Sequence, residues 1–166
     1  MSISRITDLL EQMAVLHEEL LELSERKKRA LIENRIDVLT EINGKESSRL
    51  QRIAELEQQR AEAVRRFYEE KGLKAPAAAN VTELSKLVFK AEEKSRLAGA
   101  QRKLLDLIDR LQAANALNRQ LIGQALAFIE FSVDVLAGPP EPEAVYRHPA
   151  KQGYGRQTAA LFDSKA

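Results

Sequence analysis

Residues 3–23 read ISRITDLLEQMAVLHEELLEL and carry the clearest structural signal in the chain. Their apolar residues recur at steps of three and four, with glutamates between them. Such spacing places the apolar side chains on one face of an α-helix and leaves the other face polar. The stretch therefore predicts a long amphipathic helix. The residues of its apolar face are Ile3, Ile6, Leu9, Leu10, Met13, Leu16, Leu20 and Leu23.

The same rhythm continues, with interruptions, as far as residue 137. It predicts helices over about residues 3–34, 37–71 and 81–137. All five prolines lie outside these ranges, at positions 76, 139, 140, 142 and 149. Since proline costs about 3 kcal/mol inside a helix, the proline-free blocks are permitted helices.

Residues between the blocks are typical of helix ends. Asp37 is suited to cap the second helix, Gly72 to end it in a left-handed conformation, and Asn80 to cap the third, with Glu83 three residues on. The connections are short, so consecutive helices are antiparallel neighbours. The sequence predicts an all-α fold: an elongated antiparallel bundle of three long helices over residues 1–137. Residues 138–166 are expected to form a flexible tail containing proline and glycine.

The third predicted helix is too long for its companions. At 1.5 Å per residue the three helices measure roughly 48, 52 and 85 Å. The surplus falls at about residues 116–137, where charge is scarce: in residues 113–137 only Arg119, Glu130 and Asp134 are charged, against 31% of the whole chain. An apolar helix end of this kind is expected to be covered. Either it is kinked and folds back on the bundle, or another molecule covers it.

Composition excludes several classes of protein. The chain has 166 residues, 26 Lys and Arg against 25 Asp and Glu, a net charge of +1, and no cysteine. It therefore has no disulfide framework or thiolate metal site, and no basic excess that would favour nucleic acid. We see no amino-terminal secretion signal and no run of about 18 apolar residues. A cytoplasmic protein with no integral membrane segment is expected.

Catalytic and metal-binding patterns are absent from the sequence. The two histidines are His17 and His148, and the helical di-metal pattern Glu-x-x-His fails because residue 14 is alanine. The nucleotide-binding, nucleophile-elbow and metalloprotease motifs do not occur. We expect no enzymatic activity, no cofactor and no metal, and a solvated or helix-flanking role for His17.

Asn115 and Asn118 fall on the apolar rhythm of the third predicted helix. They are either buried polar residues that fix the register of the bundle, or the point where the core gives way to a binding surface. The sequence leaves both interpretations open.

Several segments resemble the FlgN family of flagellar export chaperones. The second helix is similar in its pattern of Lys45, Leu50, Ile53, Leu56, Glu57 and Arg60. Residues 115–122, NALNRQLI, resemble the paired-asparagine segment of that family. In the family this segment is followed by an apolar helix end. The Pro-Glu-Pro linker at 140–142, Tyr146 and the run GYGRQT at 153–158 resemble its tyrosine-bearing carboxyl terminus.

The resemblance implies a cytoplasmic chaperone of the flagellar type III export pathway. Its clients would be the hook–filament junction proteins FlgK and FlgL, whose amphipathic terminal helices it would cap before delivery to the export gate protein FlhA. Carried over, the client-binding residues are Asn118, Leu121, Ile122, Leu126, Ile129, Val133 and Leu136.

The resemblance also implies gate docking by a tail tyrosine, for which Tyr146 is preferred. Here the sequence departs from the family pattern, because Arg147-His148-Pro149 stands where a glycine is expected. Tyr154, between two glycines, is therefore a competitor.

Other interpretations of the apolar end stay open. It could be the core of the bundle itself, or the seam of a self-associating coiled-coil scaffold, although Glu46, Arg49 and Arg60 interrupt a long homodimeric seam. A peripheral membrane helix over 121–136 lacks flanking lysines and arginines. A monomer or weak dimer is expected.

Overall fold

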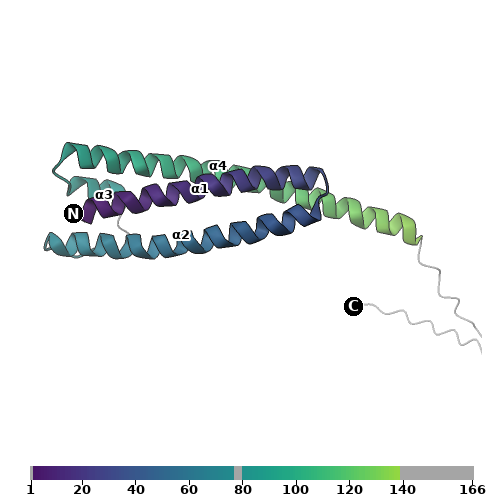
Figure 1. Ribbon diagram of the computed structural model, residues 1–166, viewed down its shortest axis with the longest axis horizontal. Coiled ribbons are helices and arrows are strands. Elements are labelled where there is room, and N and C mark those ends of the chain that lie inside the picture. The colour runs from purple at the N-terminus through teal and green to yellow at the C-terminus, as the bar shows by residue number, and fades with distance from the viewer. Residues whose placement is uncertain (1, 77–79, 139–166) are drawn as a thin grey trace, which may run out of the picture. The chain divides into compact units, whose positions relative to one another are not determined.

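The computed structural model describes residues 2–76 and 80–138. It divides into two compact units, residues 1–130 and residues 131–166, and of the second only 131–138 are described. The described ranges hold four helices and no strand, so the predicted all-α fold is confirmed. The helices are α1 (Ser2–Ile32), α2 (Ile36–Glu70), α3 (Val81–Lys86) and α4 (Ala91–Ala137) (Figure 1).

The core of the first unit receives side chains from all four helices. Leu9 of α1, Leu56 of α2 and Leu84 of α3 are almost completely buried in it, and Leu97 of α4 joins them. A second cluster, made by Leu20, Leu23 and Ile42, lies nearer the turn between α1 and α2. The apolar face predicted for residues 3–23 is therefore the face of α1 that packs in the core: only Leu16 among its eight residues falls short of full burial.

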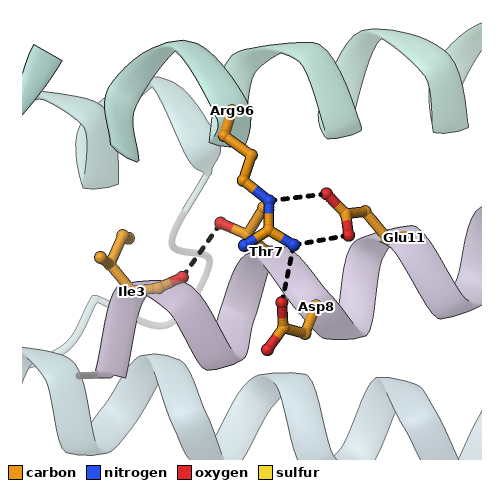
Figure 2. Close-up of polar contacts among 5 residues, drawn as sticks. All are labelled: Ile3, Thr7, Asp8, Glu11 and Arg96. Atoms are coloured by element: carbon orange, nitrogen blue, oxygen red, sulfur yellow. Dashed lines mark hydrogen bonds and ion pairs between the residues drawn. The ribbon is translucent and has the colours of Figure 1, made fainter. Parts of the chain in front are cut away.

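Ion pairs across α1 and α4 show that these two helices run parallel. The Arg96 guanidinium donates to both carboxylate oxygens of Glu11, at 2.7 and 3.0 Å, and to Asp8 at 2.9 Å (Figure 2). Lys103 lies 2.9 Å from Glu18. The two pairs advance by seven residues along both helices, as in parallel helices. By contrast α2 is antiparallel to α1, because Lys27 pairs with Glu46 whereas the earlier residue Glu19 pairs with the later residue Arg49. The Glu11 and Asp8 carboxylates also raise the pKa of Arg96, with the hydrogen bond to Glu11 as the largest cause.

The connection between α1 and α2 is a tight turn near its predicted place. Asn34 takes the left-handed conformation, with φ 55°, which asparagine tolerates better than most residues. The Arg35 amide donates to the Ala30 carbonyl at 2.9 Å and closes the end of α1. Asp37 was the wrong residue for the cap: Arg35 takes that position without a side-chain hydrogen bond, and Asp37 lies in the first turn of α2.

Two other predicted helix ends are confirmed. Gly72 follows α2 with φ 68°, and its amide donates to the Glu69 carbonyl at 2.9 Å. Asn80 caps α3, because its side chain accepts a hydrogen bond of 2.8 Å from the Glu83 amide.

The prediction of one helix over 81–137 is wrong, because the chain leaves the helical path at residues 87–90. Arg96 is level with Asp8, so in parallel helices residue 90 is level with the first residue of α1. A straight helix would carry Val81 and Leu84 past the end of α1. The break instead lets both side chains, and Val88, pack in the shared core.

Candidate functional site

Burial along α4 ends at Asn118. From residue 119 to residue 138 no residue is buried, and only Leu121 and Ser132 are partly covered. In the first unit this exposed stretch carries Ile122, Leu126, Phe128 and Ile129, whose exposed fractions run from 41% to 70%. Exposed apolar surface on this scale marks an interaction site.

The described residues of the second unit have the same character. Phe131, Val133, Val135 and Leu136 are all more than half exposed. The two predicted binding residues in this unit, Val133 and Leu136, thus lie on the surface.

The buried side of α4 is a regular heptad row, which we call the first row. Its members alternate steps of three and four and are buried or half-buried as far as Leu121. The same steps continue to Ala125 and Phe128, which are exposed. The first row is Leu97, Ala100, Leu104, Leu107, Leu111, Ala114, Asn118, Leu121, Ala125 and Phe128.

Each residue of the first row is followed in the sequence by a residue of a second row, which we define by these following positions. From Ile122 onward it consists, in the first unit, of Ile122, Leu126 and Ile129, and its steps continue in the second unit to Val133 and Leu136. Five of the seven predicted client-binding residues belong to this second row, while Asn118 and Leu121 belong to the first. Phe128 is not among the predicted binding residues, although it continues the heptad steps of the apolar residues in the packed half.

Asn118 links α4 to α1 through a buried polar network. Its side-chain amide donates to the Ser24 carbonyl oxygen at 2.9 Å and contacts the Ser24 hydroxyl at 3.0 Å. That hydroxyl donates to Oδ1 of Asn115 at 3.3 Å. Asn118 is 3% exposed, whereas Asn115 lies on the surface. The structure therefore favours the register-fixing interpretation for Asn118.

We expect Asn118→Ala to lower the free energy of unfolding by about 1–2 kcal/mol, because it deletes buried hydrogen bonds and leaves a small cavity. Urea unfolding measures the change. The matched control is Asn115→Ala, which should shift the free energy by less than about 0.5 kcal/mol because Asn115 is exposed. Equal effects of the two substitutions would contradict the assigned role.

A pocket of about 310 Å³ opens beside this network, between α1, α2 and α4. Apolar side chains from all three helices line it, together with the ion pair between Lys27 and Glu46, whose charged atoms lie 2.5 Å apart. Oδ1 of Asn118 is buried here and accepts no hydrogen bond from the described residues. The pocket is lined by Leu20, Lys27, Glu46, Leu50, Leu111, Asn115, Asn118, Arg119 and Ile122.

The predictions for His17 and for the two tail tyrosines remain to be compared with the structure. His17 lies half-buried within α1 and donates from Nδ1 to the Met13 carbonyl oxygen one turn earlier, at 2.7 Å. The gate-docking candidates Tyr146 and Tyr154 lie outside the described residues.

No apolar run long enough to span a membrane was expected from the sequence. This expectation needs a correction, because α4 passes a test of length and composition for such a segment. One 18-residue window of α4 has a mean hydropathy of 1.4 and at most two charged residues, so by length and composition alone it could cross a bilayer. None of that window is buried in the described structure. The same composition is found in core helices of soluble proteins, so the window is weak grounds for a membrane segment.

The fold is an α-helical bundle whose longest helix carries exposed apolar side chains beyond residue 118. A family model described as FlgN protein matches residues 1–153. The chain therefore belongs to the FlgN family of flagellar export chaperones, which is a chaperone family and not an enzyme family. It is also 33% identical over 169 residues to the "Uncharacterized protein YvyG" of Bacillus subtilis (strain 168), covering 100% of both chains. No solved structure matches the chain.

Proposed function

We propose that the chain is a cytoplasmic chaperone that binds the amphipathic terminal helices of FlgK and FlgL and delivers these clients to the export gate protein FlhA. The observation that carries the proposal is the exposed apolar end of α4, where Ile122, Leu126 and Ile129 form a row with helical spacing. Membership of the FlgN family supports the flagellar pathway.

The proposed mechanism is the capping of one helix by another. An amphipathic client helix lays its apolar face on α4, and both surfaces leave water together. Burying apolar area contributes about 25 cal/mol per Å², so several large side chains supply enough free energy to hold a helix. While it is capped, the client helix is unavailable for assembly with its own kind. No cofactor or turnover is involved.

For gate docking we propose the tail, with Tyr146 as the preferred residue because it follows the Pro-Glu-Pro linker at the distance typical of the family. Tyr154 is the alternative. The client-binding set of the proposal is Leu121, Ile122, Leu126, Ile129, Val133 and Leu136, to which Phe128 is added because it continues the first row. The predicted residue Asn118 is left out, because it is 3% exposed and its side chain bonds to Ser24.

Light-scattering mass in solution tests the proposal. We expect the free chain to have the 18.7 kDa mass of a monomer, or a weak dimer, and to gain one peptide mass with a peptide from the carboxyl-terminal helix of FlgK. A peptide of the same composition in scrambled order should not be captured, because it lacks the apolar stripe. A stable dimer that ignores the FlgK peptide would contradict the proposal and assign the apolar end to self-association.

A further inference from the structure

We propose that a client covers the end of α4 with two helices at once, one along each apolar row. This inference rests on the proposed function and adds the form of the partner. Three features of α4 support it. The apolar surface widens toward the exposed end, two helices cover the packed half, and a groove lies at the start of the second row.

The first row continues an interface that already exists inside the protein. As far as Asn118 this row packs in the core, and its next members, Leu121, Ala125 and Phe128, keep the same alternating steps. Ser24 contacts Asn118, and α1 ends eight residues after Ser24, so its last residue falls about level with Leu126. The row thus runs beyond the helix that covers it. A client helix that packs on Phe128 would extend the same seam.

The side chains of the second row become uniformly apolar at Ile122. In the packed half of α4 the same steps carry four polar side chains, Gln101, Gln112, Asn115 and Arg119, together with Ala98, Leu105 and Ile108. From Ile122 onward every step is a large apolar residue, first Ile122, Leu126 and Ile129, then Val133 and Leu136. Adjacent residues of a helix are separated by about 100°, so the two rows face clearly different directions. The exposed end therefore has a wider apolar surface than the packed half.

The packed half of α4 shows how many helices cover an apolar surface of this kind inside the protein. Its narrower apolar face already contacts both α1 and α2, because Leu111 packs against a cluster made by Leu20 and Leu23 of α1 and Ile42 of α2. A wider face at the exposed end calls for at least the same number of helices. A single client helix, with a contact stripe about 100° wide, would leave one row in water.

A groove marks the start of the second row. The pocket of about 310 Å³ is bordered by Ile122 on α4 and by Leu50 on α2, and Leu50 is 57% exposed. A helix that lies along Ile122, Leu126 and Ile129 can therefore begin between α2 and α4 and bury Leu50 as well.

The third side of the helix is polar or small. Gly123, Ala127 and Glu130 follow one another at helical spacing on the side away from both rows. A bilayer would surround the helix on all sides and bury the Glu130 carboxylate at high cost. A pair of client helices leaves this side in water, which favours the client over a lipid surface.

Site-specific photo-cross-linking tests the inference. The full chain carries p-benzoylphenylalanine at position 128, 129 or 127 and is mixed with full-length FlgK encoded in the same genome. We expect positions 128 and 129 to cross-link to two different helices of one FlgK molecule, as identified by peptide mass spectrometry. Position 127, on the polar side, should give no FlgK product. Leu126→Asp should remove the product from position 129 and leave that from position 128.

Each other result has a defined meaning. Cross-links from 128 and 129 to the same FlgK helix, or from 129 alone, would overturn the two-helix inference and leave the chaperone function intact. A product from 128 to a second copy of the chain would overturn it too. So would a product to lipid in phosphatidylglycerol–phosphatidylethanolamine vesicles that FlgK does not compete away. No FlgK product from any position would refute the proposed function itself.

Discussion

The double substitution Leu126→Asp/Ile129→Asp is expected to weaken client binding by at least about 100-fold. Each apolar side chain contributes about 1.5–3 kcal/mol when it is buried, and each introduced carboxylate must be desolvated as well. Because 1.4 kcal/mol is a factor of ten, a loss of at least about 3 kcal/mol corresponds to two orders of magnitude. Isothermal titration with the FlgK carboxyl-terminal peptide measures the effect.

The matched control for this variant is Ala127→Asp, which places one new carboxylate on the polar side of the same turn. It should leave the affinity unchanged. Leu126 and Ile129 are exposed in the free chain, so the double variant should keep its helix content and its unfolding midpoint. Unchanged client affinity in a folded double variant would remove the second row from the binding site.

The largest expected effect on stability comes from Leu97→Ala. Leu97 is 0% exposed and lies in the core cluster that joins α4 to the other helices. Deleting a buried leucine side chain costs about 2–5 kcal/mol, because apolar burial is lost and a cavity is left. That is a large share of the roughly 5–15 kcal/mol that stabilises an ordinary domain. Urea unfolding followed by circular dichroism measures the change.

Leu105 provides the control for Leu97, since it lies on the same helix and is 51% exposed. Leu105→Ala should lower the free energy of unfolding by less than about 0.5 kcal/mol. If both alanine variants were equally stable, Leu97 would not have the core position described.

The long helices and most of their ends could be predicted from local chemistry. The steps of three and four in residues 3–23 report the buried face of α1, because helical geometry alone brings those residues together. Asn80 could be predicted because its side chain bonds three residues along the chain, and Gly72 because a positive φ strains other residues. The cap at Asp37 could not, because Asn34 and Arg35 complete the turn through the backbone.

The break before α4 could not be predicted in the same way. Residues 87–90 contain neither glycine nor proline, and the apolar rhythm passes through them. The break depends on where α1 begins, because Leu84 is buried only if α3 turns back toward Ile3 and Ile6. That information is tertiary, and one segment of sequence does not contain it.

The exposed apolar end of α4 could be predicted from the sequence, because charge is scarce after residue 113. The individual residues of the second row came from the resemblance to the FlgN family, and their role in binding stays a prediction. Phe128 was not predicted, although it continues the heptad steps of Leu111, Asn118 and Leu121 along the sequence. Asn118 faces Ser24, and this contact fixes which residues further along continue the buried side.

Because burial along α4 ends at Asn118, selection for folding and selection for binding act on different parts of this helix. Upstream, a substitution at Leu97 or Leu104 changes whether the protein folds. Downstream, under the proposed function, a substitution at Ile122 or Ile129 would change what the protein binds and leave the fold as it was. Client preference would then be free to drift in step with the client's own helices, while the scaffold that presents it stays the same.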